Sequence, residues 1–428
     1  MLISAGAKAE CPPLAELYPT SETEWPARRP AIEALMPECL ASAEYFALLG
    51  AARLNTGDLA GALEALERAL LIDPRHGGAQ VDYAEALYRS GQLFAALELN
   101  RSLLARSDLP PNLSPILNAR QRLWSRERKI ISFLGELSGG YDTNLNGAPS
   151  ASEFVLTLSG ESVIATLSPE FHPKEGGFAN ARLVGSYSVI GPEDRHDLLG
   201  SVRSRTSTDR ESDLIQFDWR YGYSRDLETN RFPLLGLEAT AGTSHLLYGG
   251  SPLYSVMDLR SRLLVRQNSG CSPLVEVAAQ YQRYHGQRLV SGVESSISGG
   301  LQCEDPAERA RLELEAGYLF NHATESARPG GDREGWRVQL RWQYRVGMGA
   351  LDLNATYARL DDDRGYSSLL ENGAARGIDN YQLRLQYQRP LNPTTRFFTG
   401  LNYQNQDSNL APFRNEGTAI EAGVRHQF

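Results

Sequence analysis

The chain has 428 residues, a formal net charge of −9 and a hydrophobic content of 41%. This length allows one large domain together with a smaller one, and the negative charge excludes nucleic-acid binding by bulk electrostatics. No stretch approaches the ~20 consecutive apolar residues that a transmembrane helix needs.

The first nine residues resemble the end of a secretory signal. Ala7-Lys8-Ala9 has the A-x-A form, with cleavage expected before Glu10. The basic region and most of the apolar region of a full signal are missing. Either the start is misassigned or the match is chance in an alanine-rich stretch. We interpret 1–9 as a signal remnant and expect export.

Residues 10–128 are predicted to form a helical domain. After a proline-rich stretch, Cys11–Arg29, we expect an apolar helix at Ala31–Leu40 and a capping helix at Leu113–Arg128. Between them, the tetratricopeptide repeat (TPR) pattern runs from Ala43 to Pro74, and a second unit starts at Gly77. The repeat positions of the first unit are Phe46, Leu49, Gly50, Ala62, Ala69 and Pro74. A plain helical bundle is the alternative, and the repeat spacing favours TPR.

Residues 129–428 are predicted to form a transmembrane β-barrel. At Gly335–Gly347, Trp336, Val338 and Leu340 alternate with Arg337, Gln339 and Arg341. Successive side chains of a strand point to opposite faces, so one face is apolar and the other polar. Segments of about ten residues with this alternation are typical of outer-membrane barrels, whose outside faces lipid. We count fourteen antiparallel strands, an even number as expected.

The polar phase of these strands is assigned to the lumen. An arginine facing lipid at the midplane would cost ~2–4 kcal/mol, which supports this assignment. The lumen-facing residues singled out are Arg260, Arg262, Arg337, Arg341, Arg384, Glu238, Glu313 and Glu315. Their mixed charge suits a hydrated conduit better than a filter for one sign of charge.

The connector lengths predict the topology. The longest connector, 142–176, is expected outside the cell or folded into the lumen. The connectors on the other side are short, as for Gly191–Asp194 and Leu391–Pro393. The chain ends with alternating apolar residues and Phe428, which looks like the assembly signal of outer-membrane barrels.

Four cysteines are present, none with C-x-x-C spacing. Cys271 and Cys303 fall in predicted turns that flank one hairpin, with its tip near His285-Gly286-Gln287. In register they face each other, so a disulfide across the hairpin is our hypothesis. Two free thiols in turns are the alternative.

The sequence shows no catalytic constellation, neither H-E-x-x-H nor G-x-S-x-G, and we expect no enzyme, cofactor or metal. The run Asp361-Asp362-Asp363 could hold Ca²⁺ through carboxylate oxygens. A solvated outer loop is the more ordinary interpretation of such a run.

One motif stands apart at the start of the barrel. It reads Gly139-Gly140-Tyr141-Asp142-Thr143-Asn144-Leu145-Asn146-Gly147-Ala148-Pro149. By itself it could be a turn that caps the first strand, because Asp and Asn bond their own backbone in turns. Together with TPR repeats and a fourteen-strand barrel, it resembles the G-Y-D-S-N-x-N-x-A-P signature of the surface lipoprotein assembly modifier (Slam) family. The matching residues are Gly140, Tyr141, Asp142, Thr143, Asn144, Asn146 and Pro149, with Thr143 where serine is usual.

This resemblance implies an outer-membrane translocon that delivers surface lipoproteins or related secreted proteins from the periplasm to the cell surface. It implies a TPR domain in the periplasm that meets client proteins or chaperones. The other expected partners are the barrel assembly machinery and outer-membrane lipid, with no nucleic acid, and we expect a monomer. The TPR part is small for the family, which leaves client recognition open.

Two other functions stay open. One is an exopolysaccharide export porin, which also couples TPR repeats to a barrel but has larger arrays and usually an acidic lumen. The other is a general porin with a periplasmic interaction module. The motif favours the translocon. The short TPR array weakens the case for an export porin, and the folded N-terminal domain weakens the case for a general porin.

Overall fold

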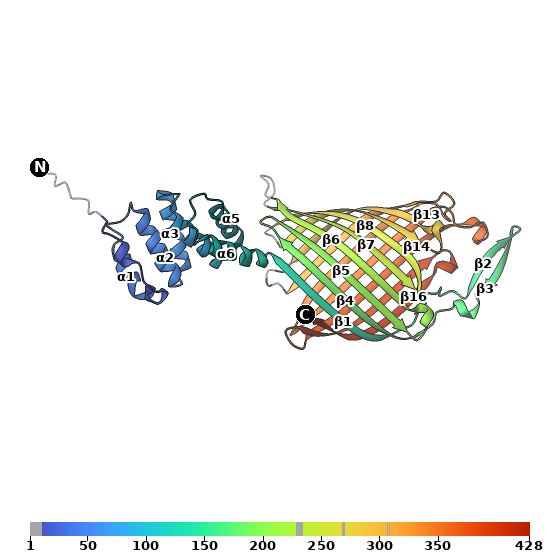
Figure 1. Cartoon of the computed structure of the whole chain (residues 1–428). Helices are drawn as coiled ribbons and strands as arrows, with labels where there is room; N and C mark the ends of the chain where they lie inside the picture. The colour runs from blue at the N-terminus through green and yellow to red at the C-terminus, as the bar shows by residue number, and fades with distance from the viewer. Residues whose placement is uncertain (1–10, 228–233, 268–269, 306, 308) are drawn as a thin grey trace. The chain divides into compact units, whose positions relative to one another are not determined.

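The computed structural model describes residues 11–227, 234–267, 270–305, 307 and 309–428, so the predicted signal remnant 1–9 lies outside the described residues. The chain divides after Lys129 into a helical unit and a barrel unit (Figure 1). The α-helices are α1 (Trp25–Ala34), α2 (Ala43–Asn55), α3 (Leu59–Ile72), α4 (Gly77–Arg89), α5 (Leu93–Leu104) and α6 (Ser114–Glu127). Within these ranges, no helix is long and apolar enough to span a membrane.

Side-chain caps begin α2, α3 and α4. The Ser42 side chain accepts a hydrogen bond from the backbone N–H of Tyr45 at the start of α2, and Asp58 accepts one from Gly61 at the start of α3. Such caps satisfy N–H groups that have no partner inside the helix. Between the paired helices, Gly57 and Gly91 adopt φ values of 87° and 85°, which glycine reaches without strain.

The core of the helical unit is built from leucine and alanine. Leu48, Leu49 and Leu66 are fully buried. Gly50 is needed because a Cβ at this position would lie 2.4 Å from Cγ of Leu66. The predicted residues Phe46, Ala62 and Ala69 are buried as well, while Pro74 lies in the exposed turn after α3.

The start of the helical unit differs from the prediction. The helix expected at Ala31–Leu40 begins earlier, at Trp25, and ends at Ala34. Pro26 lies in its first turn, where a missing N–H costs no hydrogen bond, so a proline-rich stretch can begin a helix. A disulfide joins Cys11 to Cys39 and holds the preceding segment against the core, a pairing that we did not predict.

Fourteen strands of the described chain close into an antiparallel barrel, which confirms the predicted fold class. The order around the barrel is β1-β16-β15 and so on down to β4, and β2 and β3 form a separate hairpin. The strands are β1 (Lys129–Asp142), β2 (Glu153–Leu158), β3 (Glu161–Thr166), β4 (Gly176–Ile190), β5 (Asp194–Ser207), β6 (Leu214–Leu227), β7 (Leu234–Tyr248), β8 (Ser251–Arg266), β9 (Cys271–Tyr284), β10 (Gly292–Glu304), β11 (Ala310–Ala323), β12 (Arg333–Val346), β13 (Gly349–Gly365), β14 (Ala375–Pro390), β15 (Thr395–Ser408) and β16 (Asn415–Gln427).

The outer surface of the barrel carries exposed apolar side chains. Trp219 is 59% exposed and Leu259 60% exposed, although both belong to long strands with partners on each side. A soluble protein would bury such residues, whereas lipid favours them on the outside. The inside of the barrel therefore takes the polar phase.

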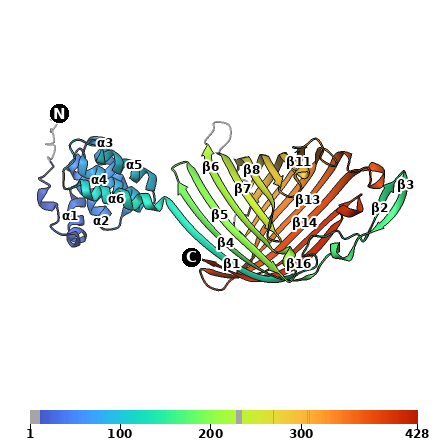
Figure 2. The same ribbon diagram turned by 45° about the vertical axis from the view of Figure 1, so that its right-hand side comes forward.

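The connector predicted as 142–176 contains structure of its own. Asp142 ends β1 and Gly176 begins β4, and the segment between them forms the β2–β3 hairpin. In both views the hairpin extends past the barrel end opposite to the C-terminus (Figures 1 and 2). The β13–β14 connector docks on it, since the backbone N–H of Thr157 donates to the carbonyl of Leu369 at 2.9 Å.

The composition of the acidic run favoured a solvated loop, and the structure shows a strand instead. Asp361-Asp362-Asp363 belongs to β13, and the Asp362 side chain is only 1% exposed. Its carboxylate lies 3.1 Å from the guanidinium groups of both Arg333 and Arg376. Arg376 in turn lies against the rings of Tyr366 and Phe413, at 4.6 and 4.5 Å. Paired cations and aromatic cover allow this acid to be buried.

Cys271 and Cys303 are joined by a disulfide between β9 and β10. They are direct partners in the register of the two strands. Both lie inside strands rather than in the turns predicted for them, because β9 begins at Cys271 and β10 continues to Glu304.

Candidate functional site in the barrel lumen

A compact ion-pair network lines one wall of the barrel, on β8, β9 and β11. Nη2 of Arg262 lies 3.0 Å from Glu276, 2.8 Å from Glu315 and 3.4 Å from Glu313. Arg341 of β12 adds a contact of 2.6 Å to Glu313. These five side chains come from four strands, so their contacts place them on the same, inner face of the wall.

Glycine on the intervening strand makes this network possible. Adjacent strands are about 4.8 Å apart, so Arg262 must reach over β10 to meet the two glutamates of β11. Gly300 of β10 has no side chain there, and a Cβ would lie 2.9 Å from Cγ of Glu315.

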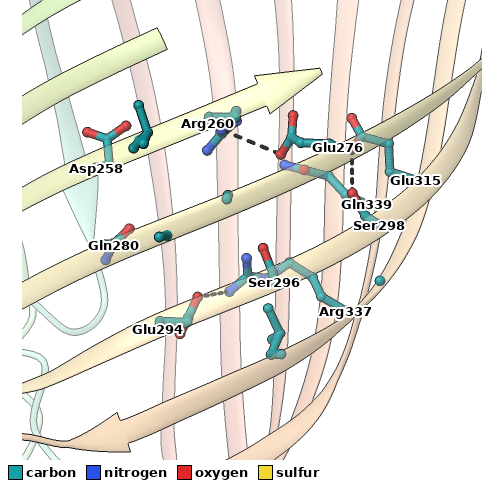
Figure 3. A pocket seen from close by; sticks show the side chains of 15 residues that line it. Asp258, Arg260, Glu276, Gln280, Glu294, Ser296, Ser298, Glu315, Arg337 and Gln339 are labelled. Atoms are coloured by element: carbon teal, nitrogen blue, oxygen red, sulfur yellow. Dashed lines mark hydrogen bonds and ion pairs between the residues drawn. The ribbon is translucent and has the colours of Figure 1, made fainter. Parts of the chain in front are cut away.

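The same wall continues along the strands toward a small polar pocket (Figure 3). Arg260 faces Glu276 at 3.5 Å, and Arg337 faces Glu294 at 3.1 Å. Ser298 donates to Glu315 at 3.3 Å. Every arginine named in this wall therefore has a carboxylate partner, and we call it the balanced wall (Arg260, Arg262, Arg337, Arg341, Glu276, Glu294, Glu313 and Glu315).

Of the eight lumen residues predicted, six come together in the balanced wall. Arg384 lies elsewhere, on β14, and pairs with Glu421 of β16 at 3.4 Å. Glu238 of β7 lines a separate cavity, together with Gly191–Arg195 and Arg266. The partners Glu276 and Glu421 were missed, although each falls on the polar phase of its strand and the alternation could have found them.

A cavity of about 710 Å³ is lined by a different set of strands from those of the balanced wall. Four arginines reach it: Arg182, Arg203, Arg205 and Arg384. Three acids also line it: Glu136, Asp142 and Glu421. We call this set the arginine-rich wall. The sequence prediction included only one of its arginines, Arg384.

The motif at the end of β1 forms part of the same cavity. Asp142 accepts from Arg205 at 2.7 Å and from the backbone N–H of Asn144 at 2.9 Å. Arg205 also covers the ring of Phe178 at 4.3 Å. Gly140 lies against that ring, and a Cβ there would lie 2.6 Å from Cζ of Phe178 and 2.1 Å from the carbonyl oxygen of Ile420. Glycine at position 140 thus lets β1 pass under Phe178.

Asn144 is the centre of the motif and is 4% exposed. Its amide donates to the carbonyls of Ala148 and Glu416, both at 2.9 Å, and its oxygen accepts from the N–H of Ala148 at 2.9 Å. Glu416 belongs to β16, so the side chain ties the segment after the first strand to the last strand.

The neighbouring motif residues extend this attachment. Asn146 donates to the carbonyl of His172 and accepts from the N–H of Lys174, both at 3.0 Å. The hydroxyl of Thr143 accepts from the N–H of Thr418 at 2.9 Å. A serine hydroxyl at position 143 could accept the same bond. Tyr141 is 43% exposed, on the phase opposite to Asp142.

Burial raises the pKa of several groups of the helical unit, among them Asp82 and Tyr18. Burial raises the pKa of Asp82, on α4, to about 6, although Arg120 opposes the shift. Burial, aided by the charges of Glu44 and Asp82, raises the pKa of Tyr18 to about 12. Tyr18 precedes α1, so the disulfide-anchored segment lies near α2 and α4, the first helices of the two repeats.

A tetratricopeptide repeat family model matches residues 54–112. No curated protein sequence matches the chain. Among solved structures, the chain is similar to the outer membrane channel DcaP of Acinetobacter baumannii, with 11% identity, a TM-score of 0.40, and coverage of 71% of this chain and 99% of that one.

Two further matches cover different shares of the chain. An anion-selective porin from Comamonas acidovorans has 11% identity and a TM-score of 0.36, over 70% of this chain and 100% of the porin. The type III secretion translocator chaperone SycD of Yersinia enterocolitica has 20% identity and a TM-score of 0.24, over 27% and 84%. At these identities the matches concern architecture alone.

Proposed function

We propose that the chain is an outer-membrane translocon that moves surface lipoproteins, or related secreted proteins, from the periplasm to the cell surface. This is the function that its resemblance to the Slam family implies. The barrel would be the conduit, and the TPR repeats would receive the client or its chaperone in the periplasm.

The observation that carries the proposal is the way the motif is built. An ordinary turn would need only the Asp142–Asn144 contact, which is local. Here Thr143, Asn144 and Asn146 make side-chain bonds to β16 and to the end of the β1–β4 connector. The signature residues therefore form a specific hydrogen-bonded structure beside the lumen cavity, which supports membership in a family defined by that signature.

The connection between the two units supports coupling of binding to transport. Only Arg128 separates the last helix, α6, from the first strand, β1. A TPR array is suited to binding extended peptides on its concave surface. A client held by the repeats would thus stay tethered to the first strand of the barrel.

The side chains of the barrel support the proposed location in the outer membrane. Its apolar outer face suits lipid, and its polar inner face suits water. The first residue of β1 and the last residue of β16 lie at the same end of the barrel. Connectors at this end include the short 191–193 and 391–394, whereas those at the other end include the long 143–175. In outer-membrane barrels the short turns face the periplasm, which would place the helical unit there.

A general porin is the second candidate. The cavity of about 710 Å³ is lined by arginine, glutamine and asparagine side chains, which would suit small hydrated solutes. A porin of this kind would use the helical unit for interactions unrelated to transport.

Surface display tests the two candidates. Candidate lipoproteins are co-expressed with the chain, and their access to protease or antibody is measured on intact cells. The translocon predicts that one client reaches the surface only when the chain is present, and that deletion of 1–128 abolishes this. If no lipoprotein moves while small solutes enter the cells, the porin is correct.

A matched pair of variants separates the motif from general damage to the barrel. Asn144→Ala removes the central bonds of the motif, whereas Asn354→Ala changes an exposed asparagine that lines the same cavity. The translocon predicts loss of display for the first variant at equal barrel abundance, and normal display for the second.

A further inference from the structure

We propose that the arginine-rich wall of the lumen is a binding site for oxyanions, centred on Arg182 and Arg203. The site goes beyond the proposed function, because it would serve an acidic segment of a passing polypeptide or a free anionic solute equally. Its chemistry is the pairing of guanidinium groups with carboxylate or phosphate oxygens.

The two central arginines lie directly opposite each other. Arg182 of β4 and Arg203 of β5 are register partners, and both line the large cavity. Like charges at directly opposed positions of neighbouring strands repel one another and destabilise the pair. Arg203 also feels the charges of Arg205 and Arg384. Such a concentration of positive charge favours a bound anion.

The acids around the cavity are already engaged by other cations. Asp142 pairs with Arg205 at 2.7 Å and Glu421 with Arg384 at 3.4 Å. Glu136 pairs with Arg425 at 2.7 Å. Three acids thus serve three arginines.

Asp218 is another acid near the pair, but its oxygens accept hydrogen bonds from neutral donors. It accepts from Ser201 at 3.0 Å, from Ser244 at 2.7 Å and from Gln216 at 2.8 Å. It lowers the local potential without pairing with either arginine. Arg182 and Arg203 therefore make no ion pair with any residue that the structure describes, and both are exposed to the lumen.

The balanced wall shows that such pairing is possible in this barrel. There Arg262 contacts three glutamates and is only 12% exposed. Arg182 and Arg203 instead keep their guanidinium groups open to a cavity of about 710 Å³, which is large enough for a small ligand or a stretch of extended chain. The contrast indicates that their partner comes from outside the chain.

The test is anion binding to the purified full-length chain in detergent, measured by calorimetry at low salt. The probes are inorganic phosphate and a hexa-aspartate peptide, with a hexa-asparagine peptide as the neutral control. We expect hexa-aspartate to bind, hexa-asparagine not to bind, and added salt to weaken binding, because the site is exposed to water.

Variants locate the site. Arg203→Gln should weaken hexa-aspartate binding about tenfold, the effect of losing one charge-assisted hydrogen bond. Combining it with Arg182→Gln should weaken binding further, and the double lysine variant, which keeps both charges, should retain most of it. Arg220→Gln is the matched control. Arg220 is exposed and lies on β6 four residues after Gln216, the register partner of Arg203, so both side chains point to the same face.

The outcomes separate the sources of the anion. Binding of both probes supports a site for any oxyanion, and binding of hexa-aspartate alone supports one for acidic peptide segments. Binding of phosphate alone supports a site for small anions. Failure of both probes to bind, or equal weakening by Arg220→Gln and Arg203→Gln, would overturn the proposal. None of these results depends on whether lipoproteins reach the cell surface.

Discussion

The helical unit and the barrel bury opposite kinds of side chain. In the helical unit, Leu48, Leu49 and Leu66 are fully buried and charged groups lie at the surface or half-buried. In the barrel, Glu313 and Glu315 are 7% and 6% exposed, while Trp219 is 59% exposed. The first unit gains stability by removing apolar surface from water. The second leaves its apolar surface for lipid and must satisfy its polar interior with internal partners.

This difference teaches what a buried charge means in each unit. Asp82 is half-buried in the helical unit, and loss of hydration is the largest influence on its pKa. Glu313 in the barrel contacts both Arg262 and Arg341, so its burial is matched by direct partners. Removing a charge should therefore help the helical unit at Asp82 and harm the barrel at Arg262.

The largest effect is expected for Arg262→Leu. It leaves Glu276, Glu313 and Glu315 without their shared cation, and breaking a buried ion pair from one side costs about 3–5 kcal/mol. Equilibrium unfolding of the full-length chain, refolded into vesicles, measures the change. Arg220→Leu is the control, because Arg220 is exposed to the lumen. Equal destabilisation by both variants would show that the network does not matter.

In the helical unit, Leu66→Ala should cost about 3 kcal/mol, as expected for a large-to-small change in a packed core. Leu66 is fully buried and packs against Gly50. Thermal unfolding followed by the helical circular dichroism signal measures it. Leu71→Ala on the same helix, where the side chain is 78% exposed, should change little. A large loss for Leu71→Ala would contradict the assigned core.

Asn144→Ala should destabilise the barrel by about 2 kcal/mol, because it leaves the buried N–H of Ala148 and the carbonyl of Glu416 without partners. Protection of the Ala148 backbone amide from hydrogen exchange, compared with its protection in Asn354→Ala, reports whether the segment opens. If exchange after Asn144→Ala stays as slow as in the natural sequence, the motif does not hold β1 to β16 in this way.

The smallest effect concerns pH. Burial raises the pKa of Asp82 from 3.8 to about 6, so the folded helical unit binds this proton more tightly than the unfolded chain does. The stability that the protonated Asp82 side chain contributes is fully present below about pH 4 and is lost as the pH rises through about 6. Asp82→Asn should remove this slope and raise stability at neutral pH by less than about 2 kcal/mol, because solvent screening reduces the ~3 kcal/mol to which the rise in pKa alone would correspond.

Glu64→Gln, at an exposed position of α3, is the control for the pH measurement. Thermal unfolding of the helical signal between pH 4 and pH 7 gives the slope for each variant. A slope that persists in Asp82→Asn would assign the dependence to another group.

The sequence was sufficient for the barrel because alternation is a local property. Trp336 and Arg337 are neighbours in the chain, and their opposite character alone assigns the two faces of β12. The same reasoning placed Arg262 and Glu313 on one phase. It could not show that they touch, because that contact depends on the register of four strands and on the missing side chain at Gly300.

Other features escaped prediction for related reasons. Asp362 looked solvated, because nothing near it in the sequence indicates that Arg333 and Arg376 cover it. The β2–β3 hairpin is short and pairs outside the barrel, so it left no repeat of the barrel pattern. The Cys11–Cys39 disulfide joins a segment without regular periodicity to the core. Each depends on contacts between distant parts of the chain.

The central claim, that a protein client passes through this barrel, is tested most directly by photo-crosslinking in cells. A photoreactive residue is placed at Gln339 or at its neighbour Leu340. Gln339 lines both the pocket of the balanced wall and the cavity of the arginine-rich wall, whereas Leu340 lines an apolar depression with Val338 and Tyr381. The translocon predicts crosslinks to a client lipoprotein from position 339 and none from position 340. Surface display of that client without any crosslink from position 339, or with equal crosslinks from both positions, would contradict passage through the lumen.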